Sequence, residues 1–405
     1  MVRPPVPVDG QFFKSAVSGI YKQKVNHADP KDNSTFDQVY FTSDAHYKAG
    51  GPVFFMFGGE GAASSAWLTN SNMADNAKKY GALLVELEHR FYGESQPFAE
   101  LTVDNLKHLN SEQALKDADE FIQYLLKQKS IENAKVIVFG GSYAGAMAAW
   151  FREKYPKTAA GAIASSGPVE AVVDFKDYLG VVSQSLGKEC SDSIRYDRVA
   201  PSLGKECSDS IREASQQLEE DLKTTAGREE LKKLFKLCDS LEGADTDDIH
   251  NFVGSLTNAV AVIVQYNRNI KDFCKLVTDP SGGARALDRY AKAQAAHHSG
   301  CINFNYKKMI SAMKQTSKES PYVSSGTRQW TYQTCTEFGY YQTTSLKDSP
   351  FGHNRPIEFF TKRCTDIFGP QITAQTIEKA VEATNFYYGG RQPNVTNVVF
   401  PNGSL

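Results

Sequence analysis

The chain has 405 residues, and its apolar content is sufficient for one large domain or two ordinary ones. Its formal net charge of −2 leaves no basic excess, so we expect no nucleic-acid partner. No run of about 18 apolar residues occurs, and no membrane span is therefore predicted.

The N-terminal segment and three N-glycosylation sequons give opposite indications about the cellular compartment. Residues 1–7 contain no apolar h-region, so no signal peptide is visible. The sequons at Asn33, Asn394 and Asn402 are candidate glycosylation sites, and together with seven cysteines they favour the secretory pathway. We therefore interpret the true start of the protein as missing from the sequence.

The first 170 residues alternate predicted strands with predicted helices, which indicates an α/β domain with a mainly parallel sheet. Residues 111–128 have apolar residues at helical spacing, and Asn110, followed by Gln113, is predicted as the N-cap. Four short apolar runs are predicted to be buried strands, at residues 52–57, 82–88, 135–139 and 160–165. We expect helices to cover both faces of this sheet.

Charged helical segments dominate from residue 171 to about residue 380, for example at 213–223 and 229–237. All seven cysteines lie in this part and form no CxxC pair, so we expect disulfides and neither a metal site nor a cofactor. We interpret residues 171–380 as a helical domain inserted over the sheet. The strand pattern returns at residues 394–400, so residues 381–405 are predicted to resume the domain begun by residues 1–170.

One eleven-residue sequence, SLGKECSDSIR, occurs twice, at residues 185–195 and 202–212. An offset of 17 residues with only two copies does not fit a solenoid, whose units recur several times. We interpret it as a recent duplication or a sequence-assembly fault. Without one copy, six cysteines remain and can pair fully. If both copies are real, Cys190 and Cys207 compete for one partner.

The segment Gly140-Gly141-Ser142-Tyr143-Ala144-Gly145 lies directly between a predicted buried strand and an apolar helix. A serine in such a strand-to-helix turn is typical of the nucleophile elbow of α/β-hydrolases, so Ser142 is the candidate catalytic residue. Its spacing fails both nucleotide-binding templates, because Ser142 occupies the middle glycine of GxGxxG and Ala146 replaces the P-loop lysine. A tight turn without chemistry is the remaining alternative.

A serine nucleophile needs hydrogen-bond donors for the oxyanion that forms on the substrate carbonyl. One donor is the backbone N–H of the residue after the nucleophile, which here is Tyr143. The other comes from a glycine-rich loop after an earlier strand, and Gly58-Gly59-Glu60-Gly61 occupies that place. Gly59 and Glu60 are the candidate donors, with a plain β-turn as the alternative.

Six longer motifs occur in a fixed order along the chain. They are GGEG (58–61), EHRFYGES (88–95), NSEQAL (110–115), GGSYAG (140–145), WTYQTCTEFGYYQT (330–343) and NVTNVVFPNGSL (394–405). Together they resemble the prolyl carboxypeptidase-like serine peptidases, the family that also holds dipeptidyl peptidase 2. The likeness is greatest to the thymus-specific serine protease branch and runs from about Phe36 to Leu405. The resemblance implies an α/β-hydrolase domain, a helical domain inserted after the elbow region, a lysosomal or secreted enzyme, and exopeptidase cleavage, often beside proline.

Two positions depart from the family pattern. Carboxypeptidase and dipeptidyl members commonly carry Asn where this chain has Gly59, which weakens the expectation of strict post-proline specificity. Ala144 stands where glycine is usual in the elbow, and alanine is its smallest replacement. Glu60 is a candidate for holding the terminal amine of a peptide substrate. The partners that we consider are a peptide substrate and a second copy of the chain in a homodimer.

A serine nucleophile also needs a histidine base and an acid that orients it. In the family that the chain resembles, Asp-Pro-Trp and then the histidine would follow the final motif, and neither is present in this sequence. Asp348 and His353 share a loop but match no family motif. We therefore expect a truncated, inactive or severely impaired serine exopeptidase. The alternatives are a non-catalytic peptide-binding homologue and an esterase on the same fold.

Overall fold

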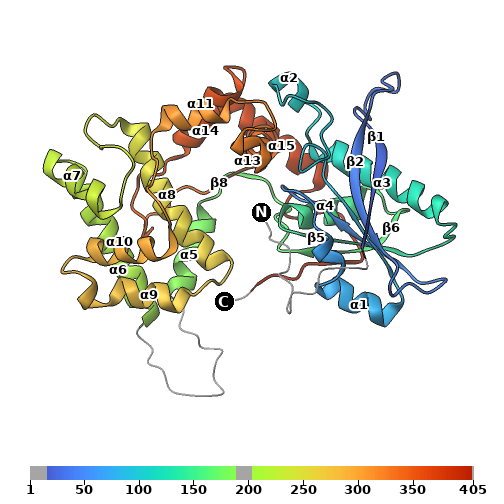
Figure 1. Ribbon diagram of the computed structural model, residues 1–405, viewed down its shortest axis with the longest axis horizontal. Coiled ribbons are helices and arrows are strands. Elements are labelled where there is room, and N and C mark those ends of the chain that lie inside the picture. The colour runs from blue at the N-terminus through green and yellow to red at the C-terminus, as the bar shows by residue number, and fades with distance from the viewer. Residues whose placement is uncertain (1–15, 188–202, 404–405) are drawn as a thin grey trace, which may run out of the picture. The chain divides into compact units, whose positions relative to one another are not determined.

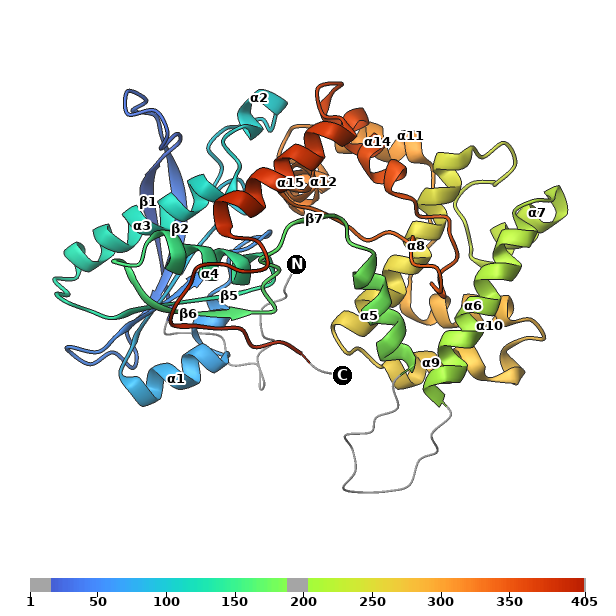
Figure 2. The same cartoon turned by 180° about the vertical axis from the view of Figure 1, so that it is seen from behind.

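The computed structural model describes residues 16–187 and 203–403, in which two compact units are distinguished (Figures 1 and 2). Unit 1 takes its residues from Met1–Ala171, Met313–Gly339 and Gln375–Ser404, and unit 2 from Val172–Ala312 and Tyr340–Ala374. Most of the first SLGKECSDSIR copy, including Cys190, and the N-terminal segment 1–7 lie outside the described residues. No helix of the described residues is both long and apolar enough to cross a bilayer.

Unit 1 is built on a seven-stranded sheet with the order β1-β2-β4-β3-β5-β6-β9. From β4 onward the neighbouring strands are parallel, whereas β1, β2 and β4 are joined by antiparallel pairing. The strands are β1 (Val17–Lys24), β2 (Thr35–Ser43), β3 (Val53–Phe57), β4 (Leu83–Leu87), β5 (Val136–Gly141), β6 (Ala159–Ser165) and β9 (Val398–Val399).

Helices cover both faces of this sheet, as expected. Phe55 and Phe57 of β3 contact Phe121 of α3 and Phe151 of α4. On the other face, Phe54 belongs to an apolar cluster that includes residues of η1 and α1. The helices of unit 1 are η1 (Ser65–Leu68), α1 (Asn72–Tyr80), α2 (Val103–Leu106), α3 (Ser111–Gln128), α4 (Tyr143–Lys154), α12 (Pro321–Ser324), α13 (Thr327–Gln333), η4 (Thr334–Phe338) and α15 (Ala374–Tyr388).

The predicted parallel core of unit 1 is confirmed. Each of the four predicted buried strands is present, and α3 begins after Asn110, whose side chain accepts a hydrogen bond from the Gln113 backbone N–H. The antiparallel strands β1 and β2 were not predicted, because their residues alternate in exposure and include polar ones. The predicted strand at residues 394–400 is confirmed only in part, since β9 has two residues.

Unit 2 is mostly helical, with a two-stranded sheet of β7 and β8. Its core is formed largely by α5, α6, α8, α9 and α10, which bury residues such as Leu179, Ile211 and Phe252. Its elements are β7 (Val172–Asp174), α5 (Lys176–Gly187), α6 (Leu203–Asp221), α7 (Thr225–Leu234), α8 (Thr246–Gln265), α9 (Ile270–Thr278), η3 (Pro280–Gly282), α10 (Ala286–His297), α11 (Tyr306–Met313), β8 (Gly339–Tyr341) and α14 (Ile357–Phe368).

Disulfides join distant parts of unit 2. Cys207 pairs with Cys274, and Cys238 with Cys301. Cys335 and Cys364 are also disulfide-bonded, so every described cysteine is oxidised. Cys207 comes from the second SLGKECSDSIR copy. Its partner Cys274 is therefore the cysteine for which Cys190 and Cys207 would compete.

The unit boundaries differ from the predicted ones in two respects. The first boundary, between residues 171 and 172, lies next to the predicted one, and the last lies between 374 and 375 rather than at 380. The segment Met313–Gly339 falls inside the predicted insertion but packs with unit 1. The physical reason is that buried polar side chains of this segment bond to residues 91 and 92 of unit 1. Gln329 donates to the Phe91 carbonyl, and Gln333 accepts from the Tyr92 hydroxyl.

Candidate active site

Ser142 lies in the turn between β5 and α4 with φ 58° and ψ −127°. A positive φ is uncommon for a residue other than glycine and is a source of local strain. Two bonds hold the backbone in this conformation, from the Ser142 N–H to the Ser165 carbonyl at 2.9 Å and from the Ala146 N–H to the Ser142 carbonyl at 3.0 Å. The Ser142 side chain makes no capping bond to α4 and is half-buried. This geometry is that of a nucleophile elbow.

Small residues on both sides of Ser142 are required by close backbone contacts. A Cβ atom at Gly140 would lie 1.9 Å from the Ala144 carbonyl oxygen, and one at Gly145 would lie 2.7 Å from the Ser165 carbonyl oxygen. Both distances are shorter than a Cβ tolerates, so these positions need glycine. Ala144 is accommodated with 4% exposure.

The glycine-rich loop that follows β3 lies beside the elbow. A Cβ atom at Gly59 would have the Ala144 Cβ as its nearest neighbour, at 3.6 Å. The loop is fixed at its start, where the Gly58 N–H donates to the Leu87 carbonyl at 2.9 Å. The loop that carries the predicted oxyanion donors Gly59 and Glu60 therefore lies next to Ala144, the residue that follows Tyr143. Glu60 is buried, and its charge raises the pKa of Tyr92 as a cause secondary to burial.

Tyr143 is anchored by a directed chain of buried hydrogen bonds. The His89 Nδ1–H donates to the Arg90 carbonyl at 2.7 Å, which leaves Nε2 to accept from the Tyr143 hydroxyl at 3.0 Å. The Tyr143 oxygen in turn accepts from the Gln333 Nε2 at 3.0 Å. The Gln333 Oε1 accepts from the Tyr92 hydroxyl at 2.6 Å. Burial lowers the pKa of His89 to about 4, which matches the neutral ring that this chain requires.

A second buried group extends this arrangement to the start of α3. The Glu337 Oε1 accepts from the Ser111 hydroxyl at 2.6 Å and from the Ser111 N–H at 2.9 Å. The Ser111 hydroxyl also contacts the Tyr388 hydroxyl at 3.0 Å. Burial raises the pKa of Glu337 to about 7, while the bonds from Ser111 act in the opposite direction. These bonds tie the N-terminal end of α3 to η4 and α15.

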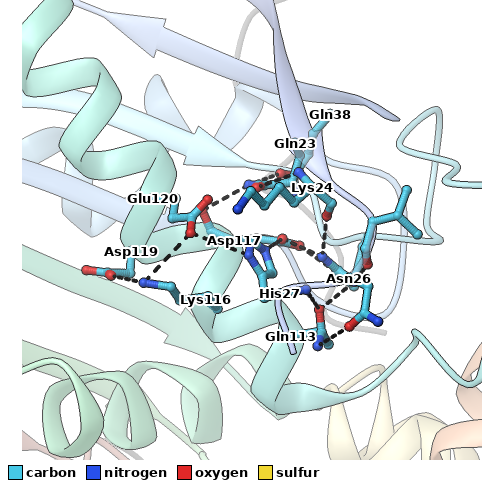
Figure 3. A network of polar contacts seen from close by, with 12 residues as sticks. Gln23, Lys24, Asn26, His27, Gln38, Gln113, Lys116, Asp117, Asp119 and Glu120 are labelled. Carbon is cyan, nitrogen blue, oxygen red and sulfur yellow. Dashed lines mark hydrogen bonds and ion pairs between the residues drawn. The ribbon is translucent and has the colours of Figure 1, made fainter. Parts of the chain in front are cut away.

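The loop that carries His89 is fixed by the buried ion pair of Arg90 and Asp117. The Arg90 Nε lies 2.7 Å from the Asp117 Oδ2, and its Nη2 lies 2.5 Å from the Oδ1. Arg90 also donates to the carbonyls of Lys24, Val25 and His108. Asp117 in addition contacts the His27 Nε2 at 2.7 Å, as Figure 3 shows. The guanidinium is therefore fully partnered.

Two more buried carboxyl groups lie on and after β4. The Glu88 carboxylate accepts from the backbone N–H groups of Ala63, Glu94 and Ser95 and from the Ser95 hydroxyl, which closes the loop behind His89. Glu86 accepts only from the Ser64 N–H, at 3.1 Å, and its Oε2 is buried without a partner among the described residues. Burial raises the pKa of Glu86 to about 8, so it is mostly protonated at neutral pH.

The histidines near the N-terminal part of the sheet are bonded to residues other than Ser142. His89, in the EHRFYGES motif, bonds to the Tyr143 hydroxyl. His27, which follows β1, bonds to the Asp117 carboxylate. Within the described chain no hydrogen bond links the Ser142 hydroxyl to a histidine. Asp348 and His353 belong to unit 2, where the Arg212 side chain binds the Asp348 carbonyl and Glu219 accepts from the His353 N–H.

The sequence reasoning missed the residues that anchor Tyr143. His89 and Gln333 stood in two of the family motifs, but no local pattern connects them with a tyrosine 54 and 190 residues away. Gln333 on α13 is buried and Glu337 on η4 is half-buried, and this burial is not readable from their neighbours in sequence.

Fold and site together define an α/β-hydrolase: a mainly parallel sheet, helices on both faces and a serine elbow between β5 and α4. The model of the serine carboxypeptidase S28 family matches residues 23–405, and the chain belongs to this family. This confirms the family that the six motifs indicated.

Curated relatives agree with this assignment. The chain is 35% identical to the serine protease K12H4.7 of Caenorhabditis elegans, over 97% of this chain and 78% of that protein. It is 33% identical to the mouse thymus-specific serine protease, with coverage of 95% and 76%. Identity to the human lysosomal Pro-X carboxypeptidase is 30%, with coverage of 95% and 76%.

Proposed function

We propose that the protein is a serine exopeptidase that cleaves peptides near one terminus. The observation that carries the proposal is the strained Ser142 at the start of α4, whose side chain is not used as a helix cap. Backbone strain at a residue other than glycine persists only where the surrounding structure enforces it, and it is common at active sites. A catalytic serine in a nucleophile elbow has this strained conformation.

The roles follow from the geometry of the elbow. Ser142 attacks the scissile carbonyl, and the Tyr143 N–H at the N-terminus of α4 donates to the oxyanion. The Gly59 or Glu60 N–H supplies the second donor, because this loop lies beside Ala144. The hydroxyl, ring and helix contacts of Tyr143 hold its backbone in place, so the donor is ordered before substrate binds.

The 405 residues alone are expected to be severely impaired in hydrolysis. A serine hydroxyl is a weak nucleophile without a base, and no histidine of the described residues bonds to Ser142. Oxyanion donors and binding alone retain only a small part of the rate of a complete triad. The alternative of a non-catalytic peptide-binding homologue has the same structural basis.

Substrate preference rests on the loop and on the relatives. The lysosomal Pro-X carboxypeptidase in the family supports cleavage beside proline. Gly59, which has only Ala144 near its Cβ position, leaves room where family members commonly carry Asn, and so favours a broader preference. We assign Glu60, a buried carboxylate in the same loop, to the terminal amine of the substrate.

Fluorophosphonate labelling tests this proposal. The protein purified from its source should label at Ser142 and release residues or dipeptides from a peptide end, and Ser142→Ala should abolish both. The recombinant 405-residue chain should label far more slowly. A source-purified protein that does not label would exclude the peptidase and leave the peptide-binding homologue. Labelling with hydrolysis of aryl esters but not of peptides would identify an esterase.

We also place the protein in the secretory pathway, as a lysosomal or extracellular protein. The disulfides of unit 2 form in oxidising compartments. Asn33, Asn394 and Asn402 are all exposed, as glycan acceptors must be. Glycosidase treatment of the protein from its source should reduce its apparent mass, and Asn→Gln variants would assign each site. Light scattering would test for a homodimer.

A further inference from the structure

Two guanidinium groups of unit 2, one buried and one half-buried, have no carboxylate partner among the described residues. Arg355, which precedes α14, is 5% exposed, and Arg363 on α14 is half-buried. Among the described residues neither forms an ion pair within 4.0 Å. The Nε atoms of both are buried and have no hydrogen-bond partner.

The surroundings of these two groups are aromatic and uncharged. Both guanidiniums lie over the Phe360 ring, at 5.1 Å for Arg355 and 5.4 Å for Arg363. One Arg355 nitrogen, Nη1, donates to the Asn258 Oδ1 at 2.8 Å. Burial, followed by the charge of Arg363, lowers the pKa of Arg355 to about 9, and no carboxylate acts in the other direction. Burial also lowers the pKa of Arg363, while Tyr341 and Tyr306 act in the other direction.

The acidic residues of α14 interact with other groups. Asp366 accepts from Lys362 at 2.5 Å and from the Tyr306 hydroxyl at 2.9 Å. Glu358 is exposed to solvent, and Asp247 of α8 lies 3.1 Å from Lys362. The local positive charge is therefore not balanced by α14 or by the facing α8.

Contact with one aromatic ring does not compensate for this arrangement. A cation over a phenyl ring gains far less than a cation loses when it leaves water, and two like charges add their repulsion. Arg90 of unit 1 shows the alternative, since it is equally buried but bound to a carboxylate. Among the described residues Arg355 and Arg363 have no carboxylate of this kind.

We propose that Arg355 and Arg363 form a binding site for a carboxylate beside the Phe360 ring in unit 2. A guanidinium presents paired donors whose spacing matches the two oxygens of a carboxylate. The unpartnered Nε atoms are donors of this kind. α14 begins at Ile357, two residues after Arg355, so the positive end of its dipole adds to the same attraction. The partial exposure of Arg363 gives a ligand access.

Thermal unfolding with added sodium acetate at constant ionic strength tests this site. Binding to the folded state should raise the Tm of the full chain in a saturable manner, by about 2 °C or more at saturation. Arg355→Met and Arg363→Met should each weaken the apparent affinity for acetate at least about tenfold, because each removes a charge-assisted bond. If one variant does not fold, the other decides.

Arg285→Met is the matched control within unit 2. The Arg285 guanidinium is already paired with Asp221, Glu230 and Asp288, so its loss should lower the Tm and leave the response to acetate unchanged. No acetate response in the wild type, or equal responses in all variants, would overturn the proposal.

N-acetylglycine and its amide distinguish the two sources of a carboxylate. A response to the acid and not to the amide would show that the site takes a peptide C-terminus. A response to acetate alone would show that it takes small free carboxylates. These measurements do not use hydrolysis, so they remain valid if Ser142 proves not to be catalytic.

Discussion

The two units treat buried positive charge in opposite ways. Arg90 of unit 1 is 0% exposed and bonds to both oxygens of Asp117 and to three backbone carbonyls. Arg355 of unit 2 is 5% exposed and has one bond from its guanidinium, to the neutral amide of Asn258. The charge of Arg90 is paired with a carboxylate, whereas the charge of Arg355 has no carboxylate partner among the described residues.

This difference separates a structural group from a ligand-directed one. A buried ion pair with all donors satisfied fixes two chain segments, here the His89 loop and α3, and removing either member leaves a bare charge. An unmatched buried cation contributes nothing of this kind to the fold. Its removal should therefore be tolerated, and its retention is explained by something that binds to it.

The largest effect is expected for Arg90→Met. The substitution leaves the Asp117 carboxylate buried with only the His27 ring as a side-chain partner, so the free energy of unfolding of unit 1 should fall by about 3–5 kcal/mol. Urea unfolding followed by tryptophan fluorescence measures it. Lys22→Met is the control, because Lys22 and Asp37 are exposed and their pair contributes less than about 1 kcal/mol. Equal losses of unfolding free energy in the two variants would show that the buried Arg90–Asp117 pair stabilises unit 1 no more than the exposed Lys22–Asp37 pair.

Unit 1 also contains carboxyl groups that avoid an unmatched charge by binding a proton. Burial raises the pKa of Glu86 to about 8 and that of Glu337 to about 7, both from 4.5. The folded state therefore holds protons that the unfolded state has lost. Their contribution to stability is fully present below pH 4.5 and is lost as the pH rises through about 7 to 8.

We expect unit 1 to be more stable at pH 5 than at pH 8.5, by roughly 1–3 kcal/mol. His89 acts in the other direction, because its pKa falls from 6.5 to about 4 and its contribution is lost as the pH drops through that range, so at pH 5 it already offsets part of this gain. Glu86→Gln and Glu337→Gln should each flatten the alkaline loss, as measured by urea midpoints across pH. A slope unchanged in both variants would assign the pH dependence to other groups.

The fold was predictable where the signal is local. β3 and β4 are buried on both faces, β5 is buried on one face and half-buried on the other, and all three strands begin as apolar runs that the sequence alone identifies. β2 was missed because it places Gln38 in the interior, where its side chain bonds to Gln23 of β1 at 3.0 Å. A buried polar pair between two strands leaves no mark in either sequence.

The candidate site likewise has a part that is predictable from local sequence and a part that only the fold assembles. Ser142 and its glycines were predictable because the turn is confined to six consecutive residues. The bonds of Tyr143 to Gln333 and of Ser111 to Glu337 cross 190 and 226 residues, so only the fold brings these residues together. Arg355 and Arg363 looked like ordinary charged residues of a helical segment, and burial alone distinguishes them.

Tyr143→Phe tests a neutral buried network against the charged one of Arg90. The variant leaves the His89 Nε2 and the Gln333 Nε2 without their shared partner, so we expect a loss of about 1–2 kcal/mol in the stability of unit 1. Tyr178→Phe is the control, because that hydroxyl bonds only to Gln265 near the surface of unit 2. In the source-purified enzyme the Tyr143 variant should reduce kcat more than it raises KM, since the donor N–H belongs to this residue. A stability loss without any change in kcat would make Tyr143 structural only.

The smallest effect is expected for Arg355→Met in a buffer without carboxylates. Methionine fills part of the same volume beside Phe360 and removes a charge that no described residue matches, so unit 2 should lose less than about 1 kcal/mol or become more stable. The Asn258 Oδ1 loses one bond, which limits the gain. Urea unfolding of the wild type and the variant, with and without acetate, measures this difference. Added acetate should stabilise the wild type more than the variant, because the variant binds acetate at least about tenfold more weakly. A loss of several kcal/mol in the carboxylate-free buffer, like that of Arg90→Met, would mean that Arg355 is matched by the fold and would end the contrast between the two units.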